Sequence, residues 1–112
     1  MPRDSKVYIE DMLQAARKVQ EYVRGLTRQE LAADGKTMDA VLYNLQVIGE
    51  AARNTPAELR NRHPEVEWQK IAALRNVLVH EYFGLDEAII WDIVRNKVPP
   101  LIEQLQRILS KA

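Results

Sequence analysis

The sequence predicts an all-α fold, an up-down bundle of four main helices joined by short connecting helices. Glycine is scarce, at 4 of 112 residues, and runs of β-branched residues are few, which argues against strands. Apolar residues recur instead at the i, i+3, i+4, i+7 spacing of amphipathic helices. A chain of this length is expected to form one domain, spanning residues 1–112.

The first main helix is expected to begin at Asp4 or Ser5, since either side chain can cap it. It frays at Gly25 and Thr27. Its apolar stripe consists of Ile9, Met12, Leu13, Ala16, Val19, Val23 and Leu26. A short helical turn follows over residues 27–34, where Thr27 and Glu30 have the spacing of a capping box.

The second main helix follows the turn signal ADGK at residues 33–36. Its stripe consists of Met38, Val41, Leu42, Leu45, Ile48, Gly49 and Ala52. Because glycine inside a helix costs about 1 kcal/mol relative to alanine, we expect Gly49 to allow a neighbouring helix to pack closely. The segment NTP at 54–56 ends the helix, and residues 56–64 are expected to form one or two helical turns closed by Pro64.

The third main helix is expected to start near residues 65–67 and to end by Gly84. It carries Trp68, Ile71, Leu74 and Leu78. Asp86 can cap the last main helix, whose apolar residues run from Ile89 to Ile108. Pro99 and Pro100 fall inside this pattern and must kink or interrupt the helix.

Composition restricts the classes of function. Lys and Arg total 16 and Asp and Glu total 16, so nucleic acid cannot be held by bulk charge, and any contact with RNA needs a local site. The absence of cysteine excludes thiol catalysis and is compatible with the cytoplasm, the expected location. The charged start cannot serve as a signal peptide, and no charge-free run is long enough for a membrane span. No His, Asp and Glu cluster has metal-ligand spacing, so we expect neither metal nor cofactor.

The segment RNVLVHEYFG at residues 75–84 carries the candidate chemistry. On a helical wheel the arc expected to face the core holds Ile71, Leu74, Val77 and Leu78. The other face holds Ala72, Ala73, Asn76, Val79 and His80, with Arg75 at its border. We interpret this face as a seam covered by another element, and a second chain across a two-fold axis would bring two arginines and two histidines together.

A structural interpretation of the same residues is also open. His80 can be a buried, hydrogen-bonded residue at a helix end, and Arg75 can belong to a surface ion pair. The other histidine, His63, lies between Arg62 and Pro64 and is expected to be a solvated loop residue.

The segment RNVLVHEY at 75–82 fits the pattern R-x4-H-x-Y and resembles the HepT-like branch of the HEPN superfamily. Further segments look like the same branch: LQVIGEAA at 45–52, HPEVEW at 63–68 and IIWDIVRNKVPPLIEQL at 89–105. The resemblance covers about residues 5–109, in order and without large gaps. It implies an HEPN-like helical domain that forms a homodimer with its motif helices facing each other.

The resemblance also implies a function. It implies a metal-independent endoribonuclease, the toxin of a type VII-like toxin–antitoxin system, with Arg75 and His80 as catalytic residues and Asn76 in support. Tyr82 matches the tyrosine onto which an MNT-type nucleotidyltransferase antitoxin transfers AMP from ATP. The implied partners are therefore RNA, a second copy of the chain and this antitoxin, with no membrane.

The residue types suit this chemistry. RNA carries its own nucleophile, the 2′-OH, so cleavage without a metal needs a base, an acid and a cation for the developing charge. His80 suits proton transfer, and Arg75 suits the phosphate because it stays charged and offers paired donors. Asn76 lies four residues before His80 and can orient it. Glu50 either lines the same cleft or has a structural role between helices.

Two other functions remain open from the sequence. The chain can be a non-catalytic nucleotide-binding or docking subunit of a minimal nucleotidyltransferase, in which Arg75 and His80 hold a phosphate without cutting. It can also be a helical interaction domain with no ligand, although the intact R-x4-H pattern argues against this.

Overall fold

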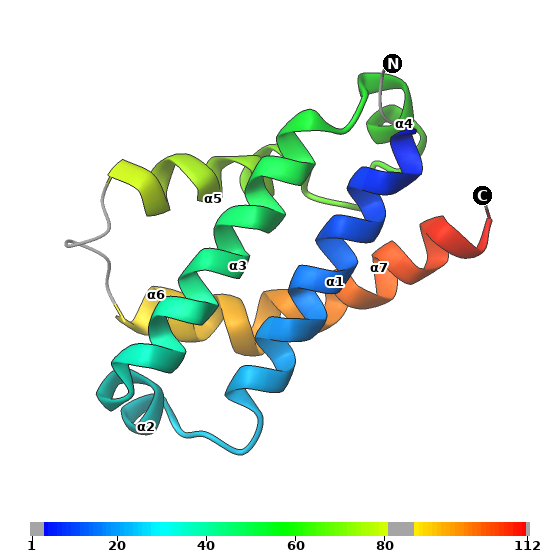
Figure 1. The fold of residues 1–112 in the computed structure, drawn as a ribbon. Helices are drawn as coiled ribbons and strands as arrows, with labels where there is room; N and C mark the ends of the chain where they lie inside the picture. Colours follow the sequence, from blue (N-terminus) through cyan, green and yellow to red (C-terminus); the bar gives the residue numbers. More distant parts are fainter. Residues whose placement is uncertain (1–3, 81–86, 112) are drawn as a thin grey trace.

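The computed structural model describes residues 4–80 and 87–111, and for residues 76–80 it describes the backbone alone. In these ranges the regular structure is helical and no strand occurs. The helices are α1 (Ser5–Val23), α2 (Arg28–Ala33), α3 (Gly35–Asn54), α4 (Ala57–Arg62), α5 (Trp68–His80), α6 (Glu87–Asp92), the π-helical segment η2 (Ile93–Lys97) and α7 (Val98–Ser110) (Figure 1). The predicted all-α fold of four main helices and short connecting helices is confirmed.

The first two helices are capped as the sequence predicts. The side chain of Asp4 accepts a hydrogen bond from the backbone N–H of Lys6 at 3.0 Å. The N–H of Glu30 donates to Oγ1 of Thr27 at 3.1 Å, and the N–H of Thr27 donates to Oε1 of Glu30 at 2.9 Å, so the capping box of α2 is complete. Gly25 lies between the two helices at φ +76°, a conformation that residues with a Cβ rarely adopt.

Asp34 joins α2 to α3 by ending one helix and capping the next. Its carboxylate accepts hydrogen bonds from the backbone N–H of Thr37 at 3.1 Å and from the Thr37 hydroxyl at 2.7 Å. These bonds favour the ionised form and hold the pKa of Asp34 below its ordinary value. At the predicted turn over residues 33–36, α2 and α3 are therefore joined by one residue, Asp34, which ends α2 and caps α3.

The core lies where α1, α3 and α7 meet. The apolar stripes predicted for α1 and α3 are buried almost throughout, and Ile9, Met12, Val19 and Val41 have no exposed surface. α1 and α3 run antiparallel side by side, and α7 crosses behind α1 (Figure 1). Burial of these stripes is the main source of stability in such a bundle.

The last part of the chain contains a π-helical segment, where a kink or interruption was predicted. Pro99 and Pro100 have no N–H, so they cannot donate to the carbonyls four residues earlier, those of Arg95 and Asn96. The N–H of Val98 donates instead to the carbonyl of Ile93, five residues earlier. The helical path from α6 to α7 thus continues past the prolines through a wider turn.

α5 packs against α3 at Gly49, as predicted. A Cβ on Gly49 would lie 2.8 Å from the backbone N of Arg75 and 3.0 Å from the carbonyl O of Ile71. Ile71 and Leu74 are half-buried against the core, as expected. Ala72, expected on the opposite face, also packs against the core. The side of α5 that meets α3 at Gly49 includes Ile71 and Arg75, so α5 is rotated about its axis relative to the predicted orientation.

The prediction for His63 is correct in its placement in a loop and wrong in its solvation, because the side chain is largely buried. His63 ends α4, its side chain is only 17% exposed, and its Nδ1 lies 3.4 Å from a carboxylate oxygen of Glu65. Its carbonyl accepts a hydrogen bond from Nε1 of Trp68 at 2.9 Å, which connects the end of α4 to the start of α5.

Among the described residues, no helix combines the length and the apolar character that crossing a bilayer requires.

Candidate functional site

Arg75 is the sequence-predicted site residue whose side chain the structure describes. Its Nε lies 2.8 Å from Oε2 of Glu50 on α3. The other carboxylate oxygen of Glu50 accepts a hydrogen bond from Nδ2 of Asn54, one helical turn further on, at 3.4 Å. Glu50 thus links α3 to α5, the structural role considered for it from the sequence, and it also borders the groove that contains Arg75; a place in a cleft between two copies stays a prediction.

The ion pair between Arg75 and Glu50 directs the guanidinium more than it stabilises the fold. The two side chains are 34% and 44% exposed, so solvent screens part of their attraction, although the contacting Oε2 of Glu50 is itself buried. Pairs of this kind contribute about 0–1 kcal/mol to stability. The surface ion pair of the structural interpretation is thus present, and it fixes Arg75 at the edge of a groove.

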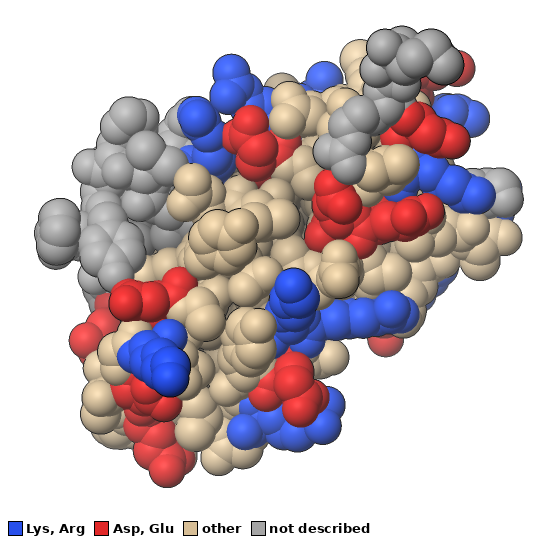
Figure 2. Space-filling view, in the orientation of Figure 1, with Lys and Arg blue, Asp and Glu red and all other residues tan. Residues whose placement is uncertain are grey.

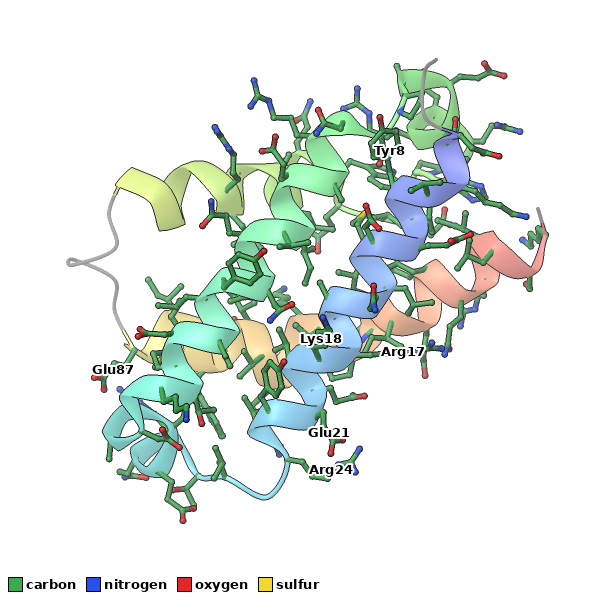
Figure 3. The ribbon with its side chains drawn as sticks, viewed as in Figure 1. Tyr8, Arg17, Lys18, Glu21, Arg24 and Glu87 are labelled. Atoms are coloured by element: carbon green, nitrogen blue, oxygen red, sulfur yellow. The ribbon has the colours of Figure 1, made fainter. Side chains whose placement is uncertain are left out.

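This groove, which we call the Arg75 groove, has a volume of about 320 Å³. It is lined by Tyr8 and Asp11 of α1, by Tyr43, Gln46, Val47, Glu50, Ala51 and Asn54 of α3, and by Arg75 of α5. Figure 3 labels Tyr8 on the side of α1 that faces α3. The volume is at the lower end of the range for small-ligand sites, about 300–1,000 Å³.

Two features of the sequence build the Arg75 groove. Its α3 residues recur every three or four positions and so lie along one side of that helix, with the buried Ala51 at the border to the core. Gly49 lets the α5 backbone approach α3, which brings Arg75 within reach of Glu50. The polar and aromatic lining of α3 was not predicted from the sequence, although the spacing of Tyr43, Glu50 and Asn54 was a signal that could have revealed it.

The other predicted site residues are described less fully. Asn76 follows Arg75 on α5, and His80 is the last residue of that helix. Both are among the residues described by their backbone alone, and Tyr82 lies outside the described residues. The structure therefore brings Arg75 together with Glu50, while the arrangement of the Asn76, His80 and Tyr82 side chains stays a prediction.

The electrostatic surroundings of the Arg75 groove are mixed. Asp11 and Glu50 place two carboxylates in the groove, and the carboxylate of Glu50 contacts the guanidinium of Arg75. Figure 2 shows acidic and basic side chains interspersed over this face, with an uncharged area along α3. In the part of the chain that the structure describes, no three His, Asp or Glu side chains are grouped to hold a metal. The chemistry available here is that of one cation, amides, carboxylates and aromatic rings.

Comparison with known proteins identifies the family. The model of the family described as Ribonuclease HepT-like matches residues 12–108. The chain belongs to the HepT-like ribonuclease family, within the HEPN superfamily. This confirms the resemblance drawn from the R-x4-H-x-Y pattern and its flanking segments.

Relatives cover nearly the whole chain. A protein of Methanocaldococcus jannaschii, provisionally named an RNase, is 40% identical over 98% of this chain and 92% of its own length. A protein of Thermococcus cleftensis, provisionally named ribonuclease HepT, is 34% identical over 96% of this chain and 98% of its own. A protein of Caldanaerobacter subterraneus, provisionally named an RNase, is 38% identical over 93% of each chain. No solved structure gives a significant match.

Proposed function

We propose that this HepT-like protein is a metal-independent endoribonuclease that uses Arg75 and His80 to cleave RNA at a cleft between two copies of the chain. The observation that carries the proposal is the placement of Arg75. Its backbone packs against Gly49, its guanidinium is directed by Glu50, and it borders an open groove. A charged donor held in this way suits a phosphate group.

The proposed reaction needs only protein groups and the RNA itself. The imidazole of His80 takes the proton of a 2′-OH, and the 2′ oxygen attacks the adjacent phosphorus. The bond from phosphorus to the 5′ oxygen breaks, and an imidazolium returns a proton to that oxygen. The products are a 2′,3′-cyclic phosphate and a 5′-OH. Arg75 stabilises the extra negative charge on the phosphorane oxygens.

A homodimer supplies the second proton-transfer group. Two copies related by a two-fold axis bring two His80 side chains to one cleft, where one acts as base and the other as acid. Asn76 is a positioning residue that holds the imidazole of His80. We place this site in a single domain over residues 1–112 that acts in the cytoplasm.

Regulation by modification completes the proposal. The protein is the toxin of a type VII-like toxin–antitoxin pair, and an MNT-type nucleotidyltransferase transfers AMP from ATP to the hydroxyl of Tyr82. Tyr82 lies two residues beyond His80 in the sequence. The added phosphodiester would pair with the cations that otherwise hold RNA, and the nucleoside would block the cleft.

RNA cleavage in EDTA tests the proposal. Wild type should cut single-stranded RNA, and Arg75→Ala and His80→Ala should each lose roughly 10²–10⁴-fold in rate. The matched control is His63→Ala, which removes the other histidine; His63 lines a different cavity, together with Asp4 and Leu59. Wild type that binds ATP without cutting RNA would favour the non-catalytic nucleotide-binding subunit instead.

A further inference from the structure

Tyr43 is an aromatic residue left open to solvent in the same groove as the proposed catalytic arginine. It is 66% exposed, compared with 39% for Tyr22 and 55% for Ile89, the other large apolar residues that are exposed in the described part of the chain. It lines the Arg75 groove, as does Tyr8 of α1. An exposed aromatic ring in a groove that also contains a cation is a common element of sites for single-stranded nucleic acid.

The polar lining of the Arg75 groove suits a base more than a phosphate backbone. Gln46 and Asn54 offer amide donors and acceptors, and Asp11 and Glu50 offer carboxylate acceptors. Carboxylates repel phosphates but accept hydrogen bonds from the amino groups of cytosine, adenine and guanine. The guanidinium of Arg75, at the edge of the same groove, is the group that attracts a phosphate.

We propose that the Arg75 groove is a base-binding subsite for single-stranded RNA. The nucleotide next to the phosphate held by Arg75 stacks on the ring of Tyr43, and its base edge lies against the polar side chains of α3. This inference rests on the proposed function, since it assigns the RNA phosphate to Arg75. It also accounts for binding by a chain of zero net charge, because stacking replaces part of the affinity that a basic surface would give.

Single-stranded RNA fits this groove better than duplex RNA. In a duplex the base faces are covered by their neighbours, so a ring on the protein surface has no base to stack on. A flexible single strand can place one base in a groove of about 320 Å³ and one phosphate on Arg75 at the same time. The groove therefore predicts cutting in unpaired segments.

Binding of an RNA that cannot be cut separates this inference from catalysis. The probes are short, fluorescein-labelled oligoadenylate and oligouridylate whose 2′-OH groups are methylated, and binding is followed by anisotropy. Tyr43→Ala should weaken binding of the oligoadenylate roughly 5- to 100-fold, the range for loss of one stacked base. Tyr43→Phe keeps the ring and should bind within about twofold of wild type. Tyr22→Ala removes an exposed tyrosine that does not line the groove and should change nothing.

Three results would overturn the inference. Tyr43→Ala could bind as tightly as wild type, or wild type could fail to bind the oligonucleotides. Tyr43→Ala could also turn a dimer into a monomer in sedimentation, which would identify this face as a contact between copies. Cutting of unmodified RNA is measured in parallel. Wild type that binds through Tyr43 but does not cut would contradict the proposed function and leave the subsite standing.

Discussion

Substitution of Gly49 by alanine tests the close packing that positions Arg75. Alanine in a helix is normally more stable than glycine by about 1 kcal/mol. At Gly49, however, the new Cβ would lie 2.8 Å from a backbone nitrogen and 3.0 Å from a backbone oxygen of α5. Backbone atoms cannot rotate away, so α5 must move as a unit. Overpacking of this kind costs about 1–3 kcal/mol, and after the helix gain of about 1 kcal/mol is subtracted the net effect should be a loss of up to about 2 kcal/mol.

Urea unfolding at one fixed protein concentration measures this loss. The matched control is Gly35→Ala, at the first residue of α3, where an added Cβ would meet no heavy atom within 4 Å. Gly35→Ala should leave stability unchanged or raise it slightly. Because the displaced α5 carries Arg75, Gly49→Ala should also lower the rate of RNA cleavage while the chain stays folded. A Gly49→Ala variant at least as stable as wild type would refute the packing argument.

Three further predictions concern single side chains. Glu50→Gln removes the charge that faces Arg75 and should change stability by less than about 1 kcal/mol in urea, because both side chains are more than a third exposed; a larger loss would mean that the pair holds the helices together. Because the pKa of Asp34 is lower in the folded chain than its ordinary value of 3.8, the ionised carboxylate stabilises the fold at pH values above 3.8, and this stabilisation is lost as the pH falls through the folded pKa. Thr37→Val removes the hydroxyl that donates to Asp34 and should bring the pKa of Asp34, measured by NMR titration, back toward 3.8. An unchanged titration midpoint would contradict this. Tyr82→Phe should gain no adenylyl mass after incubation with the cognate nucleotidyltransferase and ATP, whereas wild type should, and equal labelling of both would exclude Tyr82 as the target.

Local sequence rules accounted for the helix ends. The capping box of Thr27 and Glu30 and the cap at Asp4 depend only on residues within three positions of one another. The role of Gly49 could also be predicted, because a glycine inside a good helix requires a packing reason. In each case the structural feature depends on residues a few positions apart or on one residue that is unfavourable in a helix and therefore needs a packing reason.

Features that depend on how helices meet were predicted less well. Two prolines indicate a disturbed helix, but the sequence pattern does not specify which N–H and carbonyl pair instead, here those of Val98 and Ile93. The face of α5 that meets α3 includes Ala72 because the approach at Gly49 sets the rotation of α5. A wheel drawn for one helix holds no information on that rotation.

The candidate site likewise contains one residue that could be predicted from the sequence and one that could not. Arg75 stood out from the sequence because it begins a family motif, and the ion pair with Glu50 then joined two segments already noted. Tyr43 did not stand out, since an isolated tyrosine on a helix is commonly a core residue. Its exposure and its place in the groove that contains Arg75 became evident only when α1, α3 and α5 were assembled.

The chemical ends of the RNA products test the central claim most directly. In the proposed reaction the nucleophile is the 2′-OH of the RNA, so mass spectrometry of a defined RNA cut in EDTA should find 2′,3′-cyclic phosphate and 5′-OH ends. These products should disappear in Arg75→Ala and His80→Ala and persist in His63→Ala. Products with 3′-OH and 5′-phosphate ends, or cutting that requires a divalent ion, would contradict a metal-independent reaction carried by Arg75 and His80.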